Sequence, residues 1–588
     1  MLIRKTVLVL VLAFALLSLG LQASVLAPAV ATGGVNLLDK YSSIPLMAEA
    51  KAILTSKGME AKGYHLPNGK FNGAPMILKE GTPLDPQPVE RTQKALAIVF
   101  DFAPNPDDAT DICPGTDTYD PVPESYFWDL MFGETYDPYE LDDFSGYASL
   151  GGIDAPTDRT LKNYLFEVSD GWINDFTGTV VRVTLRNPYS YYAIGKTYFG
   201  YPNANADYTM ALIIADAVQA ADEAGVDFSD FAAEGETLDN VFLIHAGTGA
   251  EFTGQADIIW SHSWDFGSAY CYNQYVQTGD SAWLTSDQLY EDACKMLEYD
   301  GVYVNDYSTE PEVGGDITGA IGPPLADPYP PYVGVYAHEY SHVLGAPDEY
   351  DYGYESEGTG IYSLMSSGSW TRYPNAPQYS GNTPTMLDAW NRLLLGFKTP
   401  IATITARGTD EEVTLAPAST GGGIVKIVVP NTNGSEYFLV ENRQQVGFDE
   451  GLFRRNSDGA EVYGLAIYHI DENVLARNFH RSSEAPATSN RTQWNMSVDK
   501  ANGEWHYGVS ILQADGLWLL ERNLAWFGPN QLYKEGGAFT PKTYPASSSY
   551  YTNFAAYSKS KSPNYSGVFV KSIVQNDDGS MTFHAGIE

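Results

Sequence analysis

The segment HEYSHVLGAPDEYD, which begins at His338, constrains the fold of this chain more than any other stretch. It places two of the nine histidines four residues apart, with Glu339 beside the first. Two prolines precede it, and proline suits the first turn of a helix, which does not need its amide proton. A helix over 331–344 brings His338 and His342 to one face, one turn apart. The pattern therefore predicts a helix that offers two imidazole ligands to one zinc ion.

A third ligand follows from the same stretch. Gly345 accepts the left-handed conformation that ends a helix, so the chain can turn back there. Asp348 then arrives ten residues after His338, which gives the spacing H-E-x-x-H-x-x-G-x-x-D. A carboxylate is a good third zinc ligand and leaves the fourth position for water, as a catalytic site requires. Glu349 and Asp351 are alternative ligands with less suitable spacing.

Other residues near the motif suit the same chemistry. Glu339 is placed to take a proton from a zinc-activated water, as general base and then acid. Met365 lies in the small-residue stretch IYSLMSSGSW, which matches the methionine turn found beneath the zinc in metzincin peptidases. Tyr373 and Tyr379 are candidate donors to a tetrahedral oxyanion. In a chain with 41 tyrosines, ordinary packing is the favoured interpretation of both.

Composition bounds the class of protein. A chain of 588 residues is too long for one ordinary core, so two or more domains are expected. The formal charge of −40 excludes a nucleic-acid-binding surface, which needs clusters of Lys and Arg. Carboxylates in the loop Asn105–Asp111 are suited to calcium, although a solvated acidic face is the favoured interpretation.

The N-terminus has the pattern of an export signal. A short basic stretch precedes the apolar run Val7–Leu21, and Ala29-Val30-Ala31 fits a cleavage site. A run of about 15 residues is short for an uncleaved anchor. We therefore expect a signal peptide over 1–31, a Gly/Pro-punctuated propeptide or linker over 32–93, and a secreted protein without stable membrane insertion.

The pattern changes along the rest of the chain. Strands and helices alternate over 94–400, which indicates an α/β or α+β domain. Beyond it, 401–588 is rich in strand-like runs and predicts a β-rich, sandwich-like domain packed on the first. The expected elements are strands at Lys94–Ala103, Val180–Leu185, Asn240–Gly247, Asp257–Trp264, Gly423–Pro430, Glu436–Arg443, Tyr463–Asp471 and His506–Ala514, a helix at Ala206–Gly225, and a hairpin turning at Asp578-Gly579.

The remaining histidines and the cysteines carry weaker signals. The histidines in or beside predicted strands are interpreted as structural: His245, His262, His469 and His506. The three cysteines are an odd number, so at least one is free or paired outside the chain. Only Cys271 and Cys294 are close enough in sequence to suggest a local bridge.

The motif and its surroundings resemble one family. HEYSHVLGAPDEYD, SLMSSGSW and LDAWNRLLLGF are similar to the immune inhibitor A family of secreted metallopeptidases, which belongs to the metzincins. The resemblance extends upstream through LDNVFLIHAGTGAEF and downstream through EYFLVENRQQVGFD, LAIYHIDEN and GVSILQADGLWLLERN. It covers most of the chain from about Lys94 onward.

The resemblance implies an α+β, metzincin-like zinc endopeptidase that is exported as a proenzyme and acts on proteins or peptides. It implies His338, His342 and Asp348 as zinc ligands, Glu339 as general base and acid, and Met365 as the turn methionine. Relatives also bind structural calcium, but Phe231–Asn240 departs from their calcium-type run. The alternative is an exported binding or surface protein that keeps the fold without activity. The intact Glu339 and ligand set argue against it.

Overall fold

The fold is described from a computed structural model of the chain. The described residues are 89, 91–143, 146, 156–193, 210–253, 258–315, 329, 331–350, 356–373, 380–452, 462–472, 475, 507–521, 524, 528, 530–549 and 566–588. The expected signal peptide and almost all of the expected propeptide lie outside this part of the chain, as do His506, Asp351 and Tyr379. No helix in the described ranges has the length and apolar character needed to cross a membrane.

The N-terminal part of the described chain, up to about residue 400, is built on one five-stranded sheet, in the order β2-β1-β3-β7-β4. Its strands are β1 (Thr92–Asp101), β2 (Asp175–Thr184), β3 (Val241–Thr248), β4 (His262–Asp265) and β7 (Asp306–Val313). The first four strands of that order run parallel, and β4 pairs antiparallel with β7 at the edge. A mostly parallel sheet is stable when helices cover both of its faces.

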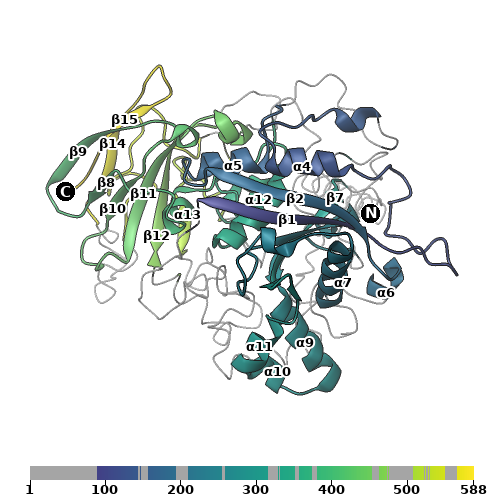
Figure 1. Ribbon diagram of the computed structural model, residues 1–588. Coiled ribbons are helices and arrows are strands. Elements are labelled where there is room, and N and C mark those ends of the chain that lie inside the picture. The colour runs from purple at the N-terminus through teal and green to yellow at the C-terminus, as the bar shows by residue number, and fades with distance from the viewer. Residues whose placement is uncertain are drawn as a thin grey trace, which may run out of the picture.

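Helices cover both faces of this sheet (Figure 1). The helices α4 (Glu124–Phe132), α5 (Leu161–Val168) and α12 (Val333–Leu344) share one buried cluster with Ala95, Ala97 and Val99 of β1. The helix α7 (Met210–Glu223) shares the other cluster with Leu96, Ile98 and Phe100. Alternate residues of β1 thus face opposite layers, which is the period of a strand buried on both sides.

Shorter elements complete this part of the chain. The helices are α6 (Tyr189–Ala193), α8 (Ala250–Thr253), α9 (Phe266–Thr278), α10 (Ala282–Thr285), α11 (Asp287–Ala293) and α13 (Ala389–Leu394), with a two-stranded ribbon of β5 (Glu298–Tyr299) and β6 (Val302–Tyr303). The 3₁₀ turns of this part are η3 (Glu140–Asp143), η4 (Phe228–Asp230), η5 (Gly360–Tyr362) and η6 (Ser367–Trp370), whereas η7 (Ala418–Thr420) and η8 (Gly447–Leu452) belong to the C-terminal part.

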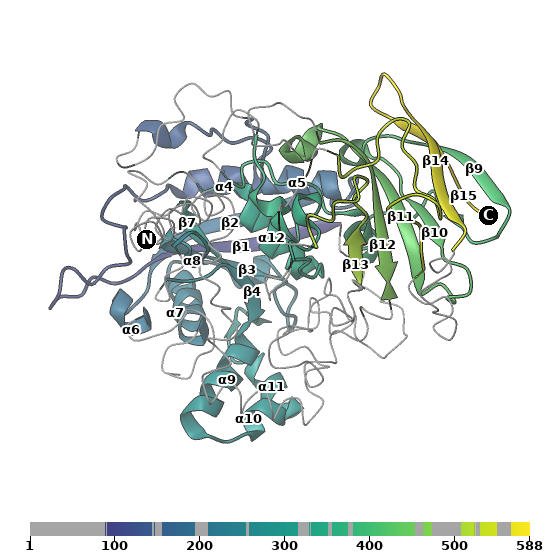
Figure 2. The ribbon, with the colours of Figure 1, turned by 180° about the vertical axis from the view of Figure 1, so that it is seen from behind.

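Two further sheets form the C-terminal part, which lies to one side of the first sheet in both views (Figure 1 and Figure 2). The larger has the order β13-β12-β11-β10-β8 and contains β8 (Ala402–Ile404), β10 (Val425–Val428), β11 (Glu436–Arg443), β12 (Gly464–Asp471) and β13 (Val509–Ile511). The smaller has the order β14-β15-β9 and contains β9 (Thr409–Leu415), β14 (Val568–Gln575) and β15 (Met581–Ile587). Residues of both sheets contribute to one buried cluster.

A separate cluster joins the C-terminal part to the N-terminal part. Tyr362 and Trp390 from the N-terminal part are buried together with Leu439 and Tyr468 of the larger sheet. The larger sheet is therefore apolar on both faces. One face packs against the smaller sheet, and the other packs against α13 and the segment before it.

Most of the expected elements are present, with two differences. The predicted strand Asp257–Trp264 is reduced to β4, because Ile259 turns its carbonyl to the amide of Ala250 at 2.8 Å instead of to a neighbouring strand. The strand β7 was not predicted, because its sequence DYSTEPEV has no apolar alternation. None of the three cysteines forms a disulfide, so the suggested bridge between Cys271 and Cys294 is absent.

Candidate metal centre

The helix α12 begins and ends where its sequence permits. It runs from Val333, with Tyr332 extended before it, and ends before Gly345. Gly345 has φ 111°, and its amide bonds back to the carbonyls of Ser341 and His342. Only glycine adopts this left-handed conformation without strain. The predicted helix stop is therefore present, and it returns the chain toward the face that carries the histidines.

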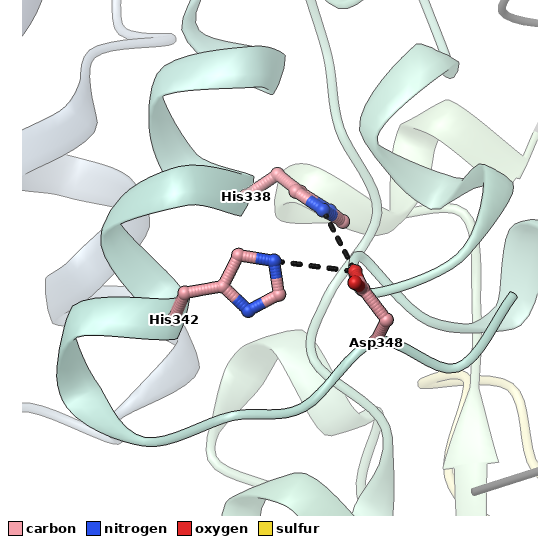
Figure 3. Close-up of side chains that lie close together, drawn as sticks. All are labelled: His338, His342 and Asp348. Atoms are coloured by element: carbon pink, nitrogen blue, oxygen red, sulfur yellow. Dashed lines mark ion pairs between the residues drawn. The ribbon is translucent and has the colours of Figure 1, made fainter. Parts of the chain in front are cut away.

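The helix and the turn bring three side chains together (Figure 3). The imidazole rings of His338 and His342 have centroids 4.8 Å apart. Oδ1 of Asp348 lies 3.2 Å from Nε2 of each ring. The candidate ligand atoms all lie within 4.8 Å of one another. Among the residues that the structure describes, this is the one group of His, Cys, Asp and Glu so arranged.

Backbone carbonyls orient both rings. Nδ1 of His338 is 3.0 Å from the carbonyl oxygen of Leu364, and Nδ1 of His342 is 2.8 Å from that of Ala346. A carbonyl only accepts, so each Nδ1 carries the proton and donates it. This assigns the neutral tautomer in which Nε2 keeps its lone pair. Such hydrogen bonds set the tautomer and the ring direction of metal-binding histidines.

The carboxyl group of Asp348 is buried but favours ionisation. Burial opposes ionisation, but the charge and the hydrogen bonds that the two imidazoles offer when they are protonated outweigh this effect, so the pKa of Asp348 lies below its usual value. Two nitrogens and one anionic oxygen are a donor set that zinc accepts, and three protein ligands are the number found in catalytic zinc sites. The residues present therefore fit a zinc ion.

Glu339 lies beside the ligands in a buried position. Its side chain is 5% exposed, and its Oε2 accepts no hydrogen bond within the described part of the chain. Burial raises the pKa of this carboxyl to about 8, against the opposing effect of His338. A dication at the neighbouring ligands would act in the opposite direction. Glu339 is thus a buried carboxyl group beside the candidate ligands, with one oxygen that has no hydrogen-bond partner in the described part of the chain.

Two acidic residues near Glu339 were missed by sequence reasoning. Glu310 of β7 and Glu251 of α8 are buried. The charge of Glu251 raises the pKa of Glu339, and the charge of Glu339 raises the pKa of Glu310. Burial raises the pKa of each of these carboxyls. Glu251 accepts hydrogen bonds from the amide and hydroxyl of Ser261. In a chain with 74 acidic residues, no local pattern distinguishes these two.

The segment of Met365 contacts the ligand-bearing elements directly. Met365 is fully buried, and its carbonyl accepts a 2.7 Å hydrogen bond from the amide of Glu349. The preceding residue, Leu364, supplies the carbonyl that orients His338. The stretch predicted as a methionine turn therefore lies against both the helix and the loop of Asp348.

The other candidates have different surroundings. The carboxyl of Glu349 accepts hydrogen bonds from Thr359 and Asn391, away from the histidine pair. Tyr373 packs against the buried tyrosine pair Tyr329 and Tyr332.

Three of the four remaining described histidines, His245, His262 and His469, are buried structural side chains, whereas His584 is partly exposed and pairs with Asp410. His262 contacts the hydroxyl of Tyr307 at 2.9 Å, and His469 pairs with Glu436 at 2.8 Å. His245 is buried beside the carbonyl of Ala246, and burial lowers its pKa to about 4. The acidic loop Asn105–Asp111 uses its last carboxylate to accept hydrogen bonds from Ser190. Calcium remains a prediction.

Helix, turn and carboxylate together give the arrangement of side chains with which metallopeptidases hold a metal ion. The family model for the catalytic domain of immune inhibitor A peptidases, family M6, matches residues 85–398. This match covers more than half of the chain, and the chain belongs to this family. The resemblance predicted from the motif is confirmed.

Two relatives illustrate the similarity. The chain is 27% identical over 322 residues to immune inhibitor A of Bacillus thuringiensis subsp. alesti, a match that covers 51% of this chain and 39% of the relative. It is 26% identical over 329 residues to the pre-pro-metalloprotease PrtV of Vibrio cholerae serotype O1 (strain M66-2), over 52% of this chain and 30% of the relative. The matched region is thus well under half of either relative.

Proposed function

We propose that this protein is a zinc-dependent endopeptidase that hydrolyses peptide bonds in protein substrates. The observation that carries the proposal is the convergence of His338, His342 and Asp348, whose Nε2 and Oδ1 atoms face one another. Family membership supports a metallopeptidase. When bound, zinc supplies a Lewis acid for the scissile carbonyl and lowers the pKa of a water molecule that it holds.

The residues of the chain supply the rest of the chemistry. Glu339 accepts the proton of the attacking water at a carboxylate oxygen and passes it to the leaving amine. Asp348 supplies the anionic ligand oxygen at Oδ1, which faces Nε2 of both imidazoles. Leu364 and Ala346 hold the imidazoles with Nε2 toward the ligand position. Met365 supports the site from below as the turn methionine.

The proposal also covers the domain boundaries and the export of the protein. We infer a metzincin-like catalytic domain over 94–400 and a sandwich-like domain over 401–588. The sheet order β2-β1-β3-β7-β4 and the cluster shared by the two C-terminal sheets support this division. We also infer export by a signal peptide over 1–31 and a propeptide over 32–93, supported by the apolar run and cleavage pattern of the sequence. Structural calcium is expected from the family resemblance.

The test is a paired measurement of zinc content and casein cleavage for wild type and Glu339→Gln. The amide keeps the shape of the side chain but cannot accept the proton. We expect about one zinc per chain in both proteins and a loss of about 10²- to 10⁴-fold in kcat/KM in the variant. Glu411→Gln, on the exposed face of β9, is the control and should match wild type.

Two results would contradict the proposal. A wild-type protein that holds zinc but cleaves nothing, even after removal of the first 93 residues, is a binding protein with a peptidase fold. A variant Glu339→Gln that retains full activity shows that the proton is carried by another group.

A further inference from the structure

The strand β11 carries three charged side chains into the interior of the protein: Glu436 at its start, and Glu441 and Arg443 at its end. Glu441 and Arg443 are fully buried, and both lie beyond residue 398, where the match to the family's catalytic domain ends. Arg392 of α13, from the N-terminal part, is also fully buried and pairs with Glu441. Buried charges are tolerated only when they are paired and hydrogen-bonded, so the contacts of these groups show what they hold in place.

The guanidinium of Arg443 donates hydrogen bonds both to a carboxylate and to a backbone carbonyl. Its Nε and Nη2 donate to the two carboxylate oxygens of Asp449, each at 2.6 Å. Its Nη1 donates to the carbonyl oxygen of Tyr362 at 2.6 Å and to Oε1 of Glu441 at 3.2 Å. The planar fork of arginine can hold a carboxylate and a carbonyl at the same time, which a lysine ammonium on a flexible stem cannot do with the same geometry.

The carbonyl that Arg443 holds belongs to the segment that supports the metal centre. Two residues after Tyr362, the carbonyl of Leu364 accepts the hydrogen bond from Nδ1 of His338 at 3.0 Å. Between them, the hydroxyl of Ser363 accepts from the amide of Met365 at 3.2 Å. The position of one zinc-binding ring is therefore set by a short segment whose first residue is held from the C-terminal sheet.

A second branch reaches the carboxylate ligand. Glu441 pairs with Arg392, one residue after Asn391 on α13. Nδ2 of Asn391 donates to Oε1 of Glu349 at 2.9 Å. Glu349 directly follows Asp348, and its amide donates to the carbonyl of the Met365 segment. The charged pair of β11 thus connects to both elements that carry the candidate ligands.

We propose that Arg443, together with Glu441, is a positioning residue of the metal centre, so that the C-terminal sheet completes the zinc site. This inference rests on the proposed zinc-dependent function. Arg443 touches neither ligand. It acts through the backbone of Tyr362 and the segment that follows, and Glu441 acts through α13. Partners of metal ligands that set their orientation typically change metal affinity by about 10- to 100-fold when they are altered.

The same strand provides an internal control. At the other end of β11, Glu436 is fully buried, pairs with His469 at 2.8 Å and accepts from the hydroxyl of Ser549 at 2.6 Å. This pair is as buried as the one at Arg443 and is formed with the neighbouring strand β12. None of these contacts involves the segment that follows Tyr362. A substitution that acts only by damaging the sheet is therefore expected to have the same effect at either end of β11.

The experiment compares Arg443→Lys and Glu436→Gln in the full chain. Zinc dissociation constants are measured by competition with a chromophoric chelator, and Tm is measured without zinc. We expect zinc binding to weaken about 10- to 100-fold in Arg443→Lys, and to remain within about twofold of wild type in Glu436→Gln, whatever the change in Tm. Arg443→Lys with wild-type zinc affinity overturns the inference, and so does an equal loss in both variants.

A milder variant keeps the test decisive if Arg443→Lys does not fold. Tyr468→Phe removes a hydroxyl that donates to Glu441 at 2.8 Å and contacts Arg443 at 3.2 Å, while the ring remains. We expect zinc affinity to fall about fivefold, the equivalent of one net hydrogen bond. An unchanged affinity overturns the inference. A wild-type protein that binds no zinc overturns the proposed function itself, and this result is distinguished by the wild-type measurement alone.

Discussion

The contact between α5 and the C-terminal part permits a quantitative prediction. Glu167 of α5 is half-buried, and its Oε1 accepts a 2.7 Å hydrogen bond from the amide of Phe448 in η8. Burial raises the pKa of the Glu167 carboxyl to about 8. The native protein therefore keeps this group largely protonated at pH 7, whereas the unfolded chain ionises it.

The sign follows from the two pKa values. The folded value lies above the unfolded value, so the contribution of Glu167 to stability is complete below about pH 4.5 and is lost as the pH rises toward about 8. Each pKa unit corresponds to about 1.4 kcal/mol, so the upper bound of the loss at pH 7 is about 3 kcal/mol. The side chain keeps some contact with water, and we expect about 1–2 kcal/mol after screening.

Glu167→Gln should recover this stability. The amide keeps an oxygen for the Phe448 amide and does not ionise, so the variant should exceed wild type by about 1–2 kcal/mol at pH 7 and match it at pH 4.5. Urea unfolding at a series of pH values measures the difference, with Glu411→Gln on the exposed face of β9 as the control. A difference that does not change between pH 4.5 and 8, or that has the opposite sign, refutes the reasoning.

Two further predictions concern α12 and the turn after it. Gly334→Ala should destabilise the protein by about 1–3 kcal/mol in urea unfolding, because a Cβ would lie 2.1 Å from the carbonyl oxygen of Ser369 and 2.8 Å from Cα of Gly381. A stability equal to wild type would mean that the helix can move away. Asp348→Asn should weaken zinc binding by at least about 100-fold, more than an outer partner would, while Tm without zinc remains a check that the chain folds. Retention of wild-type zinc affinity would remove Asp348 from the ligand set.

Much of the candidate site was predictable because it is local. The spacing of His338, His342, Gly345 and Asp348 lies within one helix and one turn, whose geometry follows from residue types. The strand β1 was predicted from its continuous apolar run, and the final hairpin from its alternating runs and turn residues, all of which are short-range signals. The structure places the three proposed ligands together, as the spacing predicted.

Other features had no local signal. Glu310 is fully buried on the strand β7, but the polar sequence DYSTEPEV does not predict a buried strand. Glu251 lies close enough to Glu339 to raise its pKa, although the two residues are far apart in the sequence. Their raised pKa values arise from burial, which is a property of the folded chain and not of the residue type.

The sequence by itself determined which ligand groups are offered, since two imidazoles and a carboxylate on one helix and turn form a donor set that zinc accepts. Tertiary structure decided how those ligands are held. Leu364 orients His338 from a separate segment, and Arg443 reaches that segment from a strand more than 70 residues further along the chain. Contacts between residues so distant in sequence depend on how sheets and helices pack together, and packing is set by the whole chain and not by any one stretch of it.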